Sequence, residues 1–122
     1  MVALTPEEKV RQWFIGVLGG EVGVPMHMMM SEVALKLGGK PWRADIIVYD
    51  RAQKPLAVVE CKEPSVTLDK SVLEQAVRYN MVLDVKYIII TNGPSTFIAG
   101  RGGDGTFSFL DRVPSYQEML GE

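Results

Sequence analysis

Three charged residues, Asp45, Glu60 and Lys62, stand inside or at the end of strongly apolar, β-branched stretches. Charged side chains are rarely placed there unless they are paired or bind metal, because removing them from water is costly. Glu60 and Lys62 belong to the run 58–62, Val-Val-Glu-Cys-Lys. In an extended strand these two side chains point to one face and that of Cys61 to the other.

An acid-x-lysine pair beside a second acid is suited to metal-dependent cleavage of phosphodiester bonds. Bound Mg²⁺ can activate water and offset charge in the transition state, and it prefers oxygen ligands while keeping several waters. We expect Asp45 and Glu60, on adjacent strands, to bind a shared ion, with the backbone carbonyl of Cys61 as a further ligand. Lys62 would position the attacking water, lower the pKa of that water or stabilise the transition-state charge.

The first predicted helix carries another candidate carboxylate. The segment Thr5-Pro6-Glu7-Glu8 begins a helix, with Thr5 as N-cap and Glu8 completing a capping box. Glu7 flanks the apolar stripe that starts at Val10, whereas Glu8 points roughly the opposite way. We therefore favour Glu7 as a metal-site carboxylate and Glu8 as a structural residue.

A second helix is expected over residues 68–83, where Gln75 and Tyr79 lie one turn apart. The expected core face of this helix consists of Leu68, Val72, Gln75, Ala76, Tyr79 and Val82. Gln75 and Tyr79 would then look inward toward the sheet, and a buried glutamine needs partners. Metal-bound water, a catalytic carboxylate or the substrate backbone would each satisfy it.

The remaining elements predict a mixed β-sheet with helices packed on it. Gly19-Gly20 is expected to end the first helix, and residues 21–27 to form a connection. Alternation and turn signals predict the strands 29–37, 43–49, 56–62, 87–91, 96–99 and 106–110, with a hairpin at Gly38-Gly39 and a short final helix over 114–120. The helix before strand 87–91 is long enough to allow a parallel pairing.

Length and composition limit the classes of protein. The 122 residues predict one domain over 1–122, and 47% hydrophobic with 23% charged residues is ordinary for a globular protein. No apolar run approaches the ~20 residues of a membrane span, and residues 1–8 lack the features of a signal peptide. We therefore expect no membrane association and a cytoplasmic location. One cysteine and one histidine exclude an internal disulfide, a multi-cysteine zinc site and a histidine-rich metal site.

The formal net charge of −2 counts against a free-standing nucleic-acid binder, because phosphate contact usually shows as a basic surplus. A nuclease centre contributes its own carboxylates to that count, and a basic partner domain could hold the DNA. The GxxxxGK[ST] phosphate loop is absent from the sequence. Any ATP-driven step would therefore lie on another chain or domain.

Taken in order, five motifs resemble the PD-(D/E)xK nuclease superfamily, and more closely the N-terminal nuclease domain of the restriction (R) subunit of type I restriction–modification enzymes. They lie within residues 6–12, 43–50, 59–62, 75–79 and 90–93, and the resemblance covers about residues 5–110. Each motif is weak alone, but all five occur in the family order, each on the expected type of element.

The resemblance implies a restriction-endonuclease-like αβββαβ core of α/β (α+β) class, and Mg²⁺-dependent DNA endonuclease activity with Mn²⁺ as a substitute. It implies catalytic roles for Asp45, Glu60 and Lys62, metal support from Glu7, and places for Gln75 and Tyr79 near the site. DNA, a motor domain and modification and specificity subunits would be the partners.

Other interpretations of these residues stay open. Glu60 and Lys62 could form a structural ion pair, Glu7 could be a solvated first-turn acid, and Gln75 and Tyr79 could be ordinary core residues. At the level of function, the alternatives are a catalytically weak module that binds DNA or docks a motor, and a stand-alone nuclease of the resolvase or repair type.

Overall fold

A six-stranded mixed sheet runs through the molecule in the computed structural model, which describes residues 4–122. The strands lie side by side in chain order: β1 (Met29–Leu37), β2 (Lys40–Tyr49), β3 (Pro55–Cys61), β4 (Tyr87–Thr91), β5 (Thr96–Arg101) and β6 (Phe107–Phe109). Neighbouring strands are antiparallel except β3 and β4, which pair in parallel. The predicted crossover helix separates these two strands, as the parallel pairing requires.

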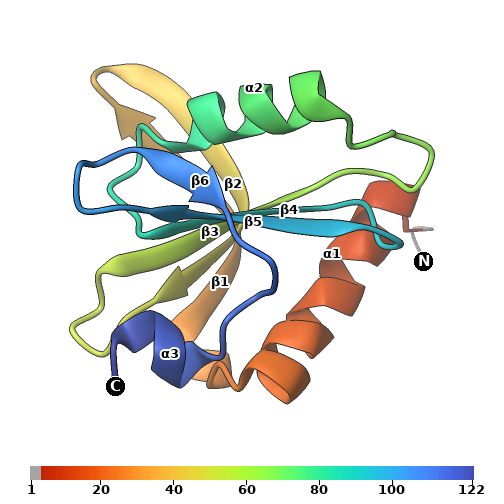
Figure 1. Cartoon of the computed structure of the whole chain (residues 1–122). Coiled ribbons are helices and arrows are strands. Elements are labelled where there is room, and N and C mark those ends of the chain that lie inside the picture. Colours follow the sequence, from red (N-terminus) through yellow and green to blue (C-terminus); the bar gives the residue numbers. More distant parts are fainter. Residues whose placement is uncertain (1–3) are drawn as a thin grey trace.

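Helices cover both faces of the sheet. Helix α2 (Lys70–Asn80) lies on one face, and α1 (Pro6–Val17) and α3 (Tyr116–Leu120) lie on the other (Figure 1). Each face has its own group of buried apolar side chains, one packed beneath α2 and one between the sheet, α1 and α3. The prediction of a mixed sheet flanked by helices, of α+β class, is confirmed. No helix in residues 4–122 combines the length and apolarity needed to cross a membrane.

Helix α1 begins as expected but ends differently. Thr5 and Glu8 form the predicted capping box. The expectation that Gly19-Gly20 ends the helix is wrong, because the chain continues as a π-helical turn, η1 (Leu18–Val22), up to Gly23 at φ 85°. Leu18 and Val22 are buried on this turn, so their packing offsets the roughly 1 kcal/mol that a glycine costs inside a helix. The connection predicted over 21–27 therefore overlaps this turn and a short 3₁₀ segment, η2 (Met26–Met28).

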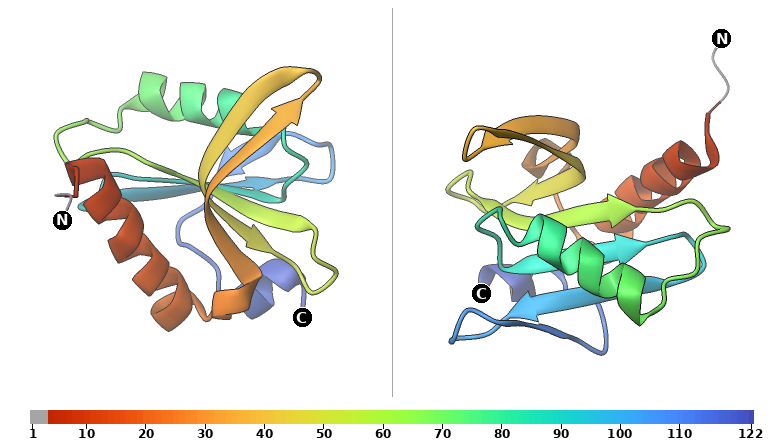
Figure 2. Two further views of the ribbon diagram at one scale, coloured as in Figure 1. Left: turned by 180° about the vertical axis from the view of Figure 1, so that it is seen from behind. Right: turned by 90° about the horizontal axis from the view of Figure 1, so that it is seen from above.

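The hairpin formed by β1 and β2 turns at Gly38 and Gly39, which take φ values of 59° and 80°. Strand β2 begins at Lys40, before the predicted start at residue 43. The far end of the hairpin curls toward the C-terminal end of α2 (Figure 2). There the rings of Trp42 and Tyr79 stack with centroids 6.1 Å apart. This contact places the start of β2 against α2.

The face that α2 turns to the sheet differs from the predicted one. Its buried residues are Leu73, Ala76 and Asn80, whereas Gln75 and Tyr79 are exposed. The expectation that Gln75 and Tyr79 look inward as buried residues is therefore wrong. The physical reason is that the ring of Tyr79 packs on Trp42 at the edge of the hairpin, a contact that helical periodicity cannot reveal.

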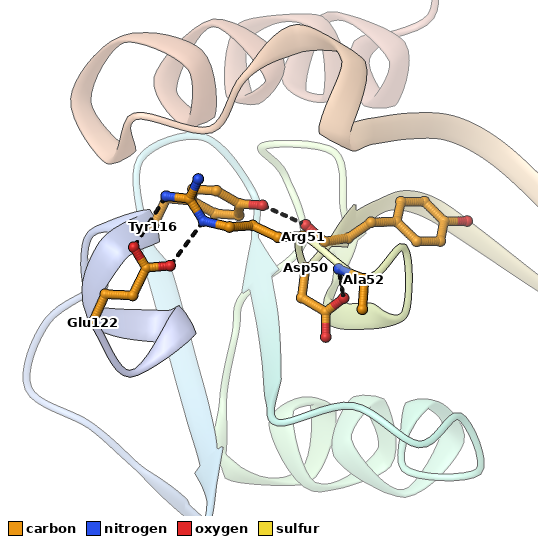
Figure 3. Close-up of polar contacts among 6 residues, drawn as sticks. Asp50, Arg51, Ala52, Tyr116 and Glu122 are labelled. Carbon is orange, nitrogen blue, oxygen red and sulfur yellow. Dashed lines mark hydrogen bonds and ion pairs between the residues drawn. The ribbon is translucent and has the colours of Figure 1, made fainter.

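The C-terminal segment is fastened to the end of the sheet opposite the α2 N-terminus. The Tyr116 hydroxyl donates to the backbone carbonyl of Tyr49 at 2.7 Å, and Arg51 pairs with Glu122 at 2.8 Å (Figure 3). Tyr116 is buried and Met119 packs beside it against the α1 side of the sheet. These contacts hold α3 in place.

Candidate active site

A cleft of about 710 Å³ opens between α1, the hairpin, the end of β3 and α2. All seven residues that the sequence singled out line it: Glu7, Asp45, Glu60, Cys61, Lys62, Gln75 and Tyr79. They come from four different elements, so the fold brings together residues that are far apart in the chain. The segment that carries Asp45 and the segment that carries Glu60 and Lys62 meet at one end of the sheet.

The cleft opens at Asp45, where β2 and β3 stop pairing. Their pairing runs from Tyr49 with Pro55 to Ile46 with Val59 and stops there. One step further, Asp45 would face Glu60, but the Asp45 side chain instead accepts a hydrogen bond at Oδ2 from the backbone N–H of Cys61, at 2.7 Å. The Asp45 carboxylate thus replaces the backbone carbonyl that would accept from Cys61 in a regular strand pair. It therefore stays beside the end of β3.

The backbone of β1 is also unusual at this point. Glu32 lies between the residues that pair with Ile46 and Ala44, beside the position of Asp45, and has a φ of 53°, a value uncommon for a residue with a side chain. Such conformations persist only where surrounding contacts hold them, and they are found mostly at functional sites. Glu32 also lines the cleft, and sequence alternation alone gave no sign of its conformation.

Glu60 and Lys62 point to one face, as the alternation predicted. The Lys62 Nζ lies 3.0 Å from Glu60 Oε2, and the two side chains are 37% and 18% exposed respectively. The other carboxylate oxygen, Oε1, accepts a hydrogen bond from Asn80 Nδ2 at 2.9 Å. The Cys61 side chain is buried among the α1-side residues, and burial raises the pKa of its thiol to about 12. The sulfur is therefore an unreactive core group.

The carboxylates of the cleft influence one another. Burial raises the pKa of Asp45, the hydrogen bond from Cys61 opposes this, and the charge of Glu60 adds to it. Burial also raises the pKa of Glu7, followed by the effect of the Asp45 charge. Glu7 is thus close enough for the charges of Asp45 and Glu60 to affect its pKa, whereas Glu8 forms part of the helix cap. Crowded carboxylates of this kind favour a cation between them.

One cation at the site was not assigned a role from the sequence. Arg11 lies one helical turn after Glu7, lines the cleft and pairs with Glu32 at 3.5 Å, with its side chain only 12% exposed. Its charge lowers the pKa of both Glu7 and Asp45, against the effect of burial. The spacing of Glu7 and Arg11 by four residues was the available signal, because side chains so spaced share a helix face.

Tyr79 is held by the hairpin rather than free in the cleft. Its hydroxyl accepts a hydrogen bond from the backbone N–H of Arg43 at 3.1 Å and lies 3.4 Å from the Arg43 carbonyl, to which it can donate. The indole N–H of Trp42 in turn donates to the Tyr79 carbonyl at 3.3 Å. Gln75 is exposed on the cleft wall one turn earlier. Tyr79 therefore ties α2 to the strand that carries Asp45.

The donors in the cleft suit a hard divalent cation. Carboxylate oxygens are the ligands that Mg²⁺ prefers, and one or two of them with several waters are a common set. Among residues 4–122, Asp45 accepts its hydrogen bond at Oδ2, and no donor lies on its Oδ1. Across the same residues, no three His, Cys, Asp or Glu side chains are close enough to form a metal-binding cluster. Asp45, Glu60 and Glu7 are among the cleft residues whose carboxylates could hold such an ion.

Comparison with known proteins identifies relatives over nearly the whole chain. The family described as "Type I restriction enzyme R protein N terminus (HSDR_N)" matches residues 6–114. A solved fragment assigned to an HsdR subunit of a type I restriction enzyme from Vibrio vulnificus YJ016 superimposes with a TM-score of 0.67 at 23% identity. The match covers 99% of this chain and 25% of that one, so the chain spans about a quarter of its length. No curated protein matches the chain.

Proposed function

Because the chain belongs to the family of type I restriction enzyme R protein N-terminal domains, we propose that it is a Mg²⁺-dependent DNA endonuclease domain that hydrolyses phosphodiester bonds. The main observation in support is that Asp45, Glu60 and Lys62 line one cleft at the point where β2 and β3 separate. The restriction-endonuclease-like fold is shared with the Vibrio vulnificus fragment and supports the same proposal.

Asp45 and Glu60 would hold the ion, with the Cys61 carbonyl as a further ligand and Glu7 as the supporting carboxylate; Mn²⁺ would substitute. When bound, a divalent ion supplies charge compensation and a water of lowered pKa. The separation of β2 from β3 leaves the Asp45 carboxylate of β2 beside Cys61, so it lies next to the end of β3 that carries Glu60 and that carbonyl. Arg11 offsets part of the carboxylate charge from the α1 side.

Lys62 is suited to hold the attacking water or the phosphate that is cleaved. Its ammonium group is 3.0 Å from Glu60 and still partly exposed to the cleft, so it can donate to a ligand there while it stays paired. Gln75 offers an amide at the same wall. Tyr79 contributes by fixing the backbone of Arg43, whose side chain lines the cleft and can meet a phosphate.

DNA is the proposed substrate, and a motor domain together with modification and specificity subunits are the proposed partners in the cytoplasm. Family membership supports these partners in the coarse sense of a multi-subunit restriction system. The acidic balance of the chain, net charge −2, agrees with DNA being held in part by another domain.

Plasmid cleavage tests the proposal. The purified chain is incubated with supercoiled plasmid and with single-stranded DNA in Mg²⁺, in Mn²⁺ and in EDTA. We expect nicking or linearisation in either metal and none in EDTA, and we expect Asp45→Ala, Glu60→Ala and Lys62→Ala to abolish it while circular dichroism spectra stay native. Intact DNA after incubation with the folded wild-type chain in both metals would count against an active nuclease.

A second candidate is a nuclease-fold module that docks a motor or binds DNA with negligible cleavage of its own. One observation favours it: Glu60 already has a partner on each carboxylate oxygen, Lys62 on one and Asn80 on the other. DNA binding that persists unchanged in the Asp45, Glu60 and Lys62 variants, without cleavage by the wild type, would support this candidate over the first.

A further inference from the structure

Asn80, the last residue of α2, is a buried polar residue beside the candidate site, with 1% of its surface exposed. Its side-chain amide donates both of its hydrogens. One goes to the carbonyl of Ala76 at 2.7 Å, and the other goes to Glu60 Oε1 at 2.9 Å. Asn80 is the direct polar link between α2 and the β3 carboxylate.

The hydrogen bond to Ala76 orients the Asn80 amide, and the hydrogen bond to Glu60 then orients the carboxylate. The Ala76 carbonyl belongs to the helix backbone, so it fixes the direction of the Asn80 amide. The amide then holds one oxygen of Glu60, while Lys62 lies 3.0 Å from the other. A glutamate side chain has several rotatable bonds, and two donors on separate oxygens fix both its rotamer and the plane of its carboxylate.

Packing alone does not explain an amide at this position. The other buried residues of α2, Leu73 and Ala76, are apolar, and an apolar residue of similar size would fill the space without the cost of burying polar atoms. What the amide adds is a donor directed at Glu60. Groups that hold metal ligands in place commonly affect metal affinity or activity by about 10–100-fold.

We propose that Asn80 is a positioning residue that orients Glu60 for a divalent cation. This inference rests on the proposed function. It gives the end of α2 a specific role at the site. The helix backbone fixes the orientation of the Asn80 amide, and the amide fixes the orientation of the Glu60 carboxylate. Asn80 itself touches neither the ion nor the DNA.

Mn²⁺ binding to the whole chain, measured by titration calorimetry, tests the proposal. Asn80→Leu keeps the branched shape and the number of non-hydrogen atoms of the side chain and removes its donors. We expect it to weaken Mn²⁺ affinity about 10–100-fold, and to cause no further loss when it is added to Glu60→Ala. Ser71→Leu is the matched control, since it places leucine at an exposed α2 position outside the cleft lining, and it should bind Mn²⁺ as the wild type does.

The outcomes separate this inference from the proposed function. Wild-type protein that binds no Mn²⁺ would overturn both. Equal Mn²⁺ affinity of folded Asn80→Leu and wild type would overturn the positioning role alone, as would a further loss in the Glu60→Ala background.

A measurement on the wild type does not depend on the folding of any variant. The ¹H–¹⁵N signals of the Asn80 side-chain amide should shift when Mg²⁺ is added, because the carboxylate that accepts its hydrogen bond then also binds the ion. Asn80 signals unchanged at a Mg²⁺ concentration that shifts the backbone signal of Glu60 would contradict the proposal.

Discussion

Replacing Tyr79 by phenylalanine separates a supporting role of its hydroxyl from a chemical one. The substitution removes the two polar contacts with the backbone of Arg43, at 3.1 and 3.4 Å, and leaves the ring on Trp42. A hydrogen bond contributes about 0.5–1.5 kcal/mol net, and both of these are long and solvent-exposed, so the expected loss is about 1 kcal/mol in total. For a chain of 122 residues this corresponds to a fall in Tm of about 3–5 °C.

Thermal unfolding and plasmid cleavage measured on the same preparations provide the assay. If the hydroxyl only ties α2 to β2, Tyr79→Phe should lower Tm by that amount and leave the cleavage rate within about tenfold of wild type. Loss of a group that transfers protons costs about 10²–10⁴-fold in rate. A rate loss of that size with unchanged Tm would refute the supporting role and favour a catalytic Tyr79.

Tyr116→Phe is the matched control. It removes one hydroxyl that donates to the Tyr49 carbonyl at 2.7 Å, at the far end of the sheet. We expect a fall in Tm of similar or greater size, because this hydroxyl is better buried, and no change in the cleavage rate. A change in that rate would show that Tm loss alone affects cleavage.

Three further expectations concern the charges of the cleft and its cysteine. Because burial raises the pKa of Asp45 above its ordinary 3.8, the folded protein keeps this proton to higher pH than the unfolded chain, and stability falls as pH rises through that interval. Asp45→Asn should therefore unfold at or above the wild-type Tm at pH 7 in EDTA while failing to cleave DNA; a lower Tm would contradict the sign. Arg11→Met removes the partner of Glu32 and should cost about 1 kcal/mol in EDTA, with a larger Tm gain on adding Mg²⁺ than in wild type; an equal gain would argue against charge compensation by Arg11. The Cys61 thiol, with its pKa raised to about 12 by burial, should resist iodoacetamide at pH 8 until guanidinium unfolds the chain, and rapid alkylation of the folded protein, seen by mass spectrometry, would contradict its burial.

Local patterns in the sequence predicted much of this structure because they depend on neighbouring residues only. The capping box of Thr5 and Glu8 needs three residues of separation, and the shared face of Glu60 and Lys62 needs only strand alternation. The same holds for the hairpin at Gly38-Gly39, whose left-handed backbone suits glycine. These features position most of the candidate site.

Features that depend on distant contacts were not predictable in the same way. The face of α2 is set partly by Trp42, which contacts Tyr79 from 37 residues away. The hydrogen bond between Asn80 and Glu60 likewise joins α2 and β3, whose relative placement cannot be read from local sequence patterns. The continuation of α1 past Gly19 depends on the burial of Leu18 and Val22. Tertiary packing outweighed local propensity at each of these points.

Diffraction from crystals of the wild-type chain soaked in MnCl₂, recorded near the manganese absorption edge, tests the proposed metal site most directly. We expect one or more anomalous peaks within coordination distance of carboxylate oxygens of both Asp45 and Glu60, with Lys62 beside a metal-bound water. A cleft free of anomalous signal in a saturating soak, or a peak that neither carboxylate touches, would contradict a metal-dependent nuclease centre in this domain.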